Sequence, residues 1–124
     1  MKKLIVIITL ALTLCLSSNL SAQPPEEVPN IEGNWLLTIY LSLADTTIYD
    51  LPYQIIQNDR HTIVVDYYTY EGRGIAFNNT IVWYFPWGCY ALYYGRIETD
   101  YYMHGYMECQ RSPDWGEWWA DKVD

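Results

Sequence analysis

The stretch that decides the fold is Cys89-Tyr-Ala-Leu-Tyr-Tyr-Gly-Arg-Ile-Glu-Thr-Asp-Tyr-Tyr-Met-His-Gly-Tyr-Met-Glu-Cys109. Two runs rich in Tyr, Ile and Met lie on either side of the polar residues 98–100. Tyr and Ile favour β-strands and polar residues favour turns, so the stretch predicts a β-hairpin. If Ile97 pairs with Tyr101 and the pairing continues outward, Cys89 lies opposite Cys109. We therefore predict a hairpin closed by a disulfide between these two cysteines.

This pairing gives the hairpin an odd-numbered and an even-numbered face, because side chains alternate along a strand. The odd face is the more apolar and is expected to point into the core. Its residues are Ala91, Tyr93, Gly95, Ile97, Tyr101, Met103, Gly105 and Met107. The even face carries four tyrosines, which we expect to form an exposed patch that docks a protein or glycan partner. These are Tyr90, Tyr94, Tyr102 and Tyr106.

Outside the hairpin, short segments with alternating or continuous apolar residues predict six further strands. They comprise residues 31–43, 53–57, 62–68, 73–77, 80–85 and 117–123. In the first of them, every second residue from Trp35 to Leu43 is apolar and is expected inside. Residues 44–50 show no period and predict a loop, whereas Asn78-Asn79 is typical of a two-residue hairpin turn. No helical apolar period occurs beyond the N-terminal segment, so we expect no helix longer than a turn or two.

Eight short strands in sequence favour an up-and-down meander, which can close on itself and so remove both exposed edges. Closure requires the first strand to pair with the last. These two strands carry similar sequences, Gly33-Asn34-Trp35 and Gly116-Glu117-Trp118. We therefore predict an all-β domain over residues 31–124, an eight-stranded antiparallel up-and-down meander barrel.

The motif Gly33-x-Trp35 resembles the Gly-x-Trp signature of the calycin barrels, the group that contains lipocalins, fatty-acid-binding proteins and avidins. In those barrels the tryptophan plugs one end, and a basic residue of the last strand commonly packs over it. The resemblance therefore implies a plug of Gly33, Trp35 and Lys122, with the Lys122 cation across the Trp35 ring. Residues 118–123 and 80–85 are similar to avidin strands in particular.

The chain also departs from these family patterns. Leu36, Leu37 and Ile39 follow Trp35 at positions where avidins show polar groups, so the resemblance does not extend to biotin binding. The long helix that follows the last strand of lipocalins has no counterpart here. The resemblance thus implies a minimal calycin-like barrel.

Residues 1–22 have the features of an export signal peptide. Two lysines precede an apolar run over residues 4–16, and the small pair Ser21-Ala22 predicts cleavage after Ala22, with Ser18 as the alternative. The apolar run is shorter than the roughly 20 residues that a membrane-spanning helix needs. Residues 23–30 include three prolines and are expected to form an extended leader ahead of the barrel.

The cysteines indicate an oxidising compartment. Two of them remain once the signal is removed, and an even pair in an exported chain predicts a disulfide. Cys15 is the alternative, as a lipid-bearing cysteine of a bacterial lipoprotein. The residue before it is Leu14, where lipoproteins carry a small residue, which argues against lipidation. We expect a periplasmic or extracellular protein, with attachment through Cys15 as the minor alternative.

The formal charge is −8, and removal of Lys2 and Lys3 with the signal would change it to −10. Nucleic acids and anionic membrane surfaces are poor partners for so acidic a chain. We therefore expect no nucleic-acid partner and no transmembrane span in the mature chain.

Residues suited to catalysis or metal binding are sparse. His61 and His104 are too few and too far apart to build a histidine-rich metal site. Asp66, Glu71 and Glu108 fall at strand ends or on outer faces, where carboxylates are solvated. No Gly-x-Ser-x-Gly motif or phosphate-binding loop is present. We expect a non-catalytic protein with no metal and no cofactor.

The chain contains 13 Tyr and 6 Trp residues. Aromatic side chains either fill a small barrel or offer flat apolar faces and hydroxyl groups to a ligand. We expect a carrier of a small hydrophobic or aromatic molecule, which binds in a barrel mouth around the Trp35 plug. The residues expected to line this mouth are Tyr53, Tyr67, Trp83, Tyr93 and Met103. The alternative is a secreted inhibitor, or a protein- or glycan-interaction module, with a filled barrel.

Overall fold

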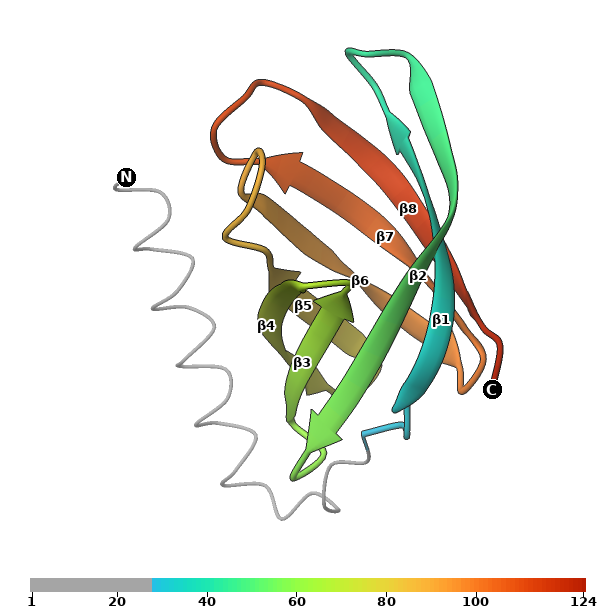
Figure 1. The fold of residues 1–124 in the computed structure, drawn as a ribbon. Coiled ribbons are helices and arrows are strands. Elements are labelled where there is room, and N and C mark those ends of the chain that lie inside the picture. Colours follow the sequence, from blue (N-terminus) through green and yellow to red (C-terminus); the bar gives the residue numbers. More distant parts are fainter. Residues whose placement is uncertain (1–27) are drawn as a thin grey trace, which may run out of the picture.

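The computed structural model describes residues 28–124, so the predicted signal (1–22) and residues 23–27 of the predicted leader lie outside the described residues. Eight strands follow one another, each antiparallel to the next, and β8 pairs with β1 to close a barrel (Figure 1). The predicted all-β meander barrel is confirmed. Its strands are β1 (Gly33–Leu41), β2 (Thr46–Asn58), β3 (Thr62–Tyr67), β4 (Tyr70–Phe77), β5 (Thr80–Tyr84), β6 (Ala91–Thr99), β7 (Tyr102–Cys109) and β8 (Trp115–Lys122).

The closing pair of strands is the predicted one. Its register runs from Trp35 opposite Lys122 to Leu41 opposite Gly116. Closure pairs both the first and the last strand on their outer sides, whereas among the described residues the first part of β2, before Gln54, has no partner on the β3 side. Within residues 28–124, we find no helix of the length and apolar character that crossing a membrane requires.

The β1–β2 hairpin is longer than the sequence indicated, and the predicted loop over 44–50 is wrong. β2 begins at Thr46, which pairs with Leu41, and the hairpin extends beyond the other strands at the top of Figure 1. Leu43, which was expected inside, lies in the turn and is 62% exposed. Both faces of the hairpin tip meet solvent, so apolar and polar residues do not alternate there. A strand without this alternation cannot be recognised from the sequence pattern.

The β6–β7 hairpin forms, but its register differs from the predicted one by two residues. Ile97 pairs with Met103 instead of Tyr101, and a register shift follows between Ile97 and Thr99. A shift of two residues preserves the faces, so Met103 is buried as expected. Tyr101 is a correction, because it lies in the turn and is 66% exposed.

The predicted disulfide between Cys89 and Cys109 is present. Ala91 takes the position opposite Cys109, and Cys89 lies just before β6 begins. The chain holds Cys89 close to β7 through backbone hydrogen bonds, since its carbonyl oxygen accepts from the amides of Gln110 at 3.0 Å and Arg111 at 2.9 Å. The Cα atoms of the two cysteines are 5.2 Å apart, a normal distance for a disulfide.

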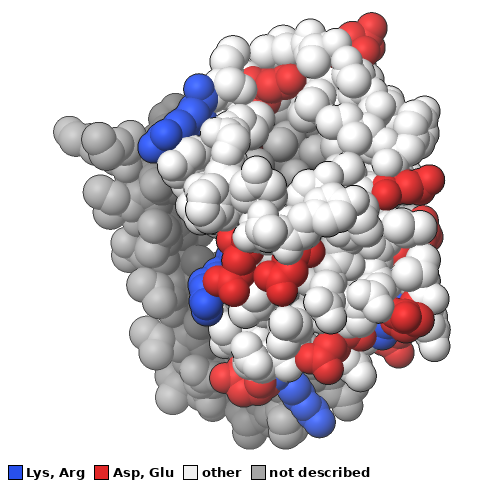
Figure 2. Space-filling model, viewed as in Figure 1, with Lys and Arg blue, Asp and Glu red and all other residues white. Residues whose placement is uncertain are grey.

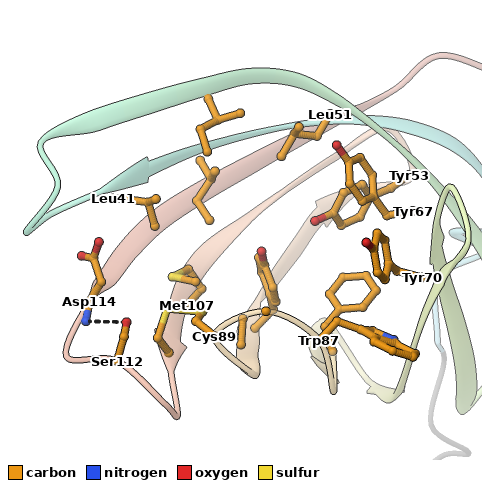
Figure 3. Close-up of a pocket in the computed structure, with 17 residues that line it drawn as sticks. Leu41, Leu51, Tyr53, Tyr67, Tyr70, Trp87, Cys89, Met107, Ser112 and Asp114 are labelled. Carbon is orange, nitrogen blue, oxygen red and sulfur yellow. Dashed lines mark hydrogen bonds between the residues drawn. A yellow bond between two sulfur atoms is a disulfide. The ribbon is translucent and has the colours of Figure 1, made fainter.

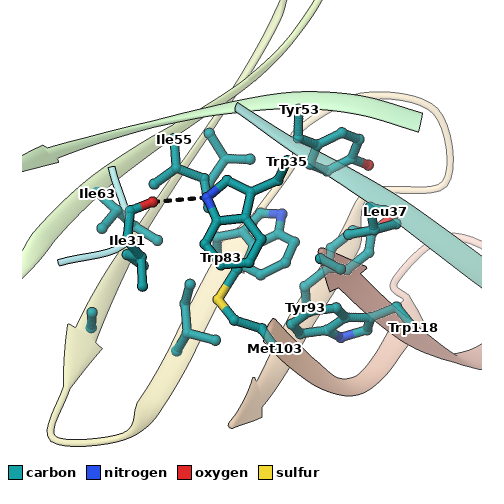
Figure 4. Close-up of a cluster of buried hydrophobic side chains, with 14 of the residues drawn as sticks. Ile31, Trp35, Leu37, Tyr53, Ile55, Ile63, Trp83, Tyr93, Met103 and Trp118 are labelled. Carbon is teal, nitrogen blue, oxygen red and sulfur yellow. Dashed lines mark hydrogen bonds between the residues drawn. The ribbon is translucent and has the colours of Figure 1, made fainter. Parts of the chain in front are cut away.

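One end of the barrel is filled by residues from the N-terminal side. The indole of Trp35 is buried, and its Nε1 donates a hydrogen bond to the carbonyl oxygen of Ile31 at 2.8 Å (Figure 4). Val28 also belongs to this core, so packing against the barrel already begins inside the predicted leader. Gln57 fixes the segment, because its side chain accepts from the Ile31 amide at 2.9 Å and donates to the Pro29 carbonyl at 3.0 Å.

The middle of the barrel is filled by stacked aromatic rings. Trp83 and Tyr93 are parallel with centroids 4.7 Å apart, and Trp118 meets Trp83 edge-on at 5.0 Å. Gly95 and Gly105 face each other beneath Trp118, and a Cβ added at Gly95 would come within 2.7 Å of its ring. Gly95 therefore provides room that the Trp118 indole occupies, and the aromatic layer separates the filled end from the opposite end.

Candidate functional site

A cavity of about 470 Å³ opens at the end of the barrel opposite Trp35, and we call it the mouth (Figure 3). Its walls come from β1, β2, the adjoining ends of β3 and β4, the β5–β6 loop, β6, β7 and the β7–β8 loop. The mouth forms here because β1 and β2 extend past their neighbours while the aromatic layer closes the barrel below.

One wall of the mouth is aromatic. Tyr53 contacts Tyr67 with ring centroids 5.3 Å apart and meets Phe85 perpendicularly at 5.7 Å. Phe85 in turn meets Tyr93 at 6.0 Å. These four rings belong to β2, β3, β6 and the residue after β5, so the closed barrel brings together residues far apart in the sequence. The arrangement presents ring faces and edges as one continuous surface.

The rest of the lining is mostly aliphatic and sulfur-rich. It includes Ile39, Leu41, Leu51 and Met107, and the Cys89–Cys109 disulfide lies beside them. Polar lining is limited to a few groups, the tyrosine hydroxyls, Ser112 and Asp114. A mostly apolar cavity with few polar groups is typical of sites for small molecules.

Two tyrosines at the floor of the mouth stay uncharged over a wide pH range. Burial is the main cause that raises the pKa of both Tyr53 and Tyr93 above the ordinary value of 10.0. The neighbouring Tyr67 adds to the increase in pKa at both sites. The floor therefore offers neutral hydroxyl groups to a ligand and no negative charge.

The structure divides the predicted ligand-binding residues into two groups. Tyr53, Tyr67 and Tyr93 line the mouth. Trp83 and Met103 do not line it, because they lie in the core beneath with only 1% of their surface exposed. The plug residue Trp35 lies at the filled end of the barrel. The indole Nε1 of Trp83 is the one buried side-chain polar atom among the described residues without a hydrogen-bond partner.

Several lining residues escaped the sequence analysis. Ile48 fell within the predicted loop 44–50 and Leu51 directly after it, while Phe85 and Trp87 flank Pro86. The available signal was composition, since two large apolar rings flank Pro86 where a connection between strands begins. Met107 was assigned to the inner face but not to the mouth.

Lys122 lies at the filled end, next to the start of β1. Its Cα is paired with that of Trp35, and its side chain passes close to the backbone of Gly33. The cation–π contact found for its ammonium group is with Tyr101, at 5.9 Å from the ring centroid. The resemblance had instead implied a contact with Trp35.

The four tyrosines of the predicted surface patch occupy three separate surroundings. Tyr94 packs against Tyr106 at 6.1 Å, and both are substantially exposed. Tyr102 stacks on the imidazole of His104 at 5.8 Å. Tyr90 lies beneath the guanidinium of Arg111, which is 3.6 Å from its ring centroid. The paired rings of Tyr94 and Tyr106 are thus the one cross-strand contact within this set in the described part of the chain.

The histidines and carboxylates do not gather at one point. Within residues 28–124, no group of three or more His, Cys, Asp or Glu side chains is placed to hold a metal ion. His104 interacts with Glu98 at 2.9 Å on the outer surface, whereas His61 contacts the carbonyl oxygen of Ala76 at 3.4 Å.

The fold and the site together define a closed eight-stranded antiparallel barrel with an apolar cavity at one end. Comparison of the chain with protein-family models gave no match, and a search among curated proteins gave no match either.

Proposed function

We propose that this protein is an exported, non-catalytic carrier that binds a small hydrophobic or aromatic molecule in the mouth. The observation that carries the proposal is the cavity of about 470 Å³ with its aromatic and aliphatic walls. Sites for small molecules commonly measure about 300 to 1,000 Å³ and combine apolar walls with a few polar groups. A module that acts only through its outer surface would have no need of an apolar cavity of this size.

Two further features support the proposal. The Cys89–Cys109 disulfide favours an oxidising compartment outside the cytoplasm. The strand order and the buried tryptophan of Gly33-x-Trp35 at one end agree with a calycin-like barrel, to which we propose that the chain belongs.

The neutral dye N-phenyl-1-naphthylamine tests the site, because its fluorescence increases in an apolar environment. We expect saturable binding to the unmodified protein. Ala91→Trp places a large ring in the mouth and should weaken binding by about tenfold or more, a loss of about 1.4 kcal/mol. Ile48→Trp, on the opposite side of the mouth, should also weaken it.

Leu92→Trp is the matched control. It introduces the same ring one residue further along β6, on the outer face, and should leave binding unchanged. Far-UV circular dichroism establishes that each variant is folded. The proposal fails if the dye does not bind the unmodified protein, or if folded Ala91→Trp and Ile48→Trp bind it as well as Leu92→Trp does. If the proposal holds, native mass spectrometry of protein purified from its own source should show a bound small molecule.

A further inference from the structure

Among the described residues 28–124, one charged group lines the mouth, the carboxylate of Asp114. This carboxylate is held in place, because its Oδ1 accepts hydrogen bonds from the backbone amides of Leu43 and Trp115, each at 2.9 Å. The side chain remains partly exposed, so solvent and ligand can reach it. The carboxylate of Asp114 therefore places a negative charge at the rim, and two backbone hydrogen bonds hold it there.

Within the described part of the chain, no positively charged residue lines the mouth beside Asp114. The loops at this end of the barrel, 42–45, 68–69, 85–90 and 110–114, contain a single Lys or Arg, which is Arg111. Its guanidinium is stacked on the ring of Tyr90 at 3.6 Å, and neither residue lines the mouth. The face of the molecule in Figure 2 likewise shows more acidic than basic side chains. The field at the mouth consequently favours cations over anions.

Asp114 and the aromatic wall lie at different ends of the mouth. In Figure 3, Asp114 is on one side of the view, Tyr53 and Tyr67 are on the other, and Leu41 and Met107 lie between them. A ligand that contacts both ends must be elongated, with a polar group at one end and an apolar body.

We infer that the mouth binds an amphiphilic cation, whose ammonium group pairs with Asp114 and whose apolar body lies along the aliphatic and aromatic walls. The inference rests on the proposed function, since it assigns a chemical class to the ligand of the same site. A carboxylate of equal length would leave its charge near Asp114 without a counter-charge, which is unfavourable. A neutral molecule would gain the apolar contacts alone.

A series of three probes with the same chain tests this assignment: decyltrimethylammonium, decan-1-ol and decanoate. Their affinities are measured by displacement of the neutral dye at low ionic strength, well below micelle formation. The ammonium compound should bind about tenfold more tightly than decanoate, with decan-1-ol between them. Added salt should narrow the difference, because the pair at Asp114 is partly exposed to solvent.

Asp114→Asn isolates the charge, because the amide oxygen can still accept the two backbone hydrogen bonds. It should weaken binding of the ammonium compound by about threefold to fivefold and leave decan-1-ol unchanged. Glu108→Gln is the matched control, since it removes one negative charge from an exposed residue that does not line the mouth. It should change neither affinity.

The outcomes separate the two proposals. If the dye and decan-1-ol bind but the ammonium compound binds no more tightly than decanoate, the assignment of a cation is overturned and the carrier function stands. Equal effects of Asp114→Asn and Glu108→Gln also overturn the assignment. If the dye and all three probes fail to bind, the proposed carrier function itself is wrong.

Discussion

At the scale of single residues, the buried tyrosines Tyr53 and Tyr93 connect the core to the mouth. Both line the cavity, yet each has only about 6% of its surface exposed. Their rings pack against Phe85 and their hydroxyl groups lie in a region of low polarity. Burial raises their pKa above 10.0, and this makes the stability of the barrel sensitive to alkaline pH.

The sign of this pH dependence follows from the direction of the shift. Above pH 10, the unfolded chain releases the protons of Tyr53 and Tyr93 while the folded chain retains them, so the folded state loses stability. We expect the free energy of unfolding to fall by about 1.4 kcal/mol per pH unit for each tyrosine. Tyr53→Phe should make the decline shallower in urea denaturation between about pH 9 and about pH 11. Tyr49→Phe, at a residue 70% exposed, should leave the slope unchanged, and equal slopes for both variants would contradict the account.

Trp35 provides a second test at this scale. Trp35→Phe removes the hydrogen bond to Ile31 and leaves a void at the filled end of the barrel. We expect the free energy of unfolding to decrease by about 2 kcal/mol. Trp115→Phe alters an exposed tryptophan and should stay within about 0.5 kcal/mol of the unmodified protein. Chemical denaturation that shows the same stability for both variants would mean that Trp35 does not act as a plug.

At the scale of secondary-structure elements, the two hairpins show what alternation in a sequence can and cannot specify. Alternation places Tyr93, Met103 and Met107 on the inner face of β6 and β7, and they are buried. It does not specify the register, because a shift of two residues gives the same faces. Turn geometry decides between such registers, and the residues 98–102 admit more than one turn. The tip of the β1–β2 hairpin was not predictable, since neither of its faces is buried.

The Cys89–Cys109 disulfide belongs to this scale because it joins the loop before β6 to the end of β7. The bond spans 20 residues, and its removal in Cys89→Ser/Cys109→Ser should lower the free energy of unfolding by about 3 kcal/mol. Both cysteines line the mouth, so the dye should also bind less tightly. Urea denaturation and the dye titration measure the two effects. A double variant as stable as the unmodified protein would show that the hairpin holds its shape without the bond.

At the scale of the whole molecule, the barrel is filled at one end and open at the other. The sequence was sufficient to predict the strand number, the order and the closing pair, because each depends on local patterns and on matching strands. It identified three lining residues of the mouth, Tyr53, Tyr67 and Tyr93. It could not separate them from Trp83 and Met103, which share the inner face but lie deeper, because depth along the barrel depends on strand stagger.

The most direct test of the central claim, that the mouth is a ligand site, uses the two methionines beyond Met1. Met107 lines the mouth, whereas Met103 lies in the core beneath it with 1% of its surface exposed. In protein with ¹³C-labelled methionine methyl groups, titration with N-phenyl-1-naphthylamine should shift the Met107 signal strongly and the Met103 signal little, with Met107→Leu providing the assignment. Saturable binding that leaves the Met107 signal unmoved, or moves both signals equally, would contradict the account, because the dye would then lie outside the mouth.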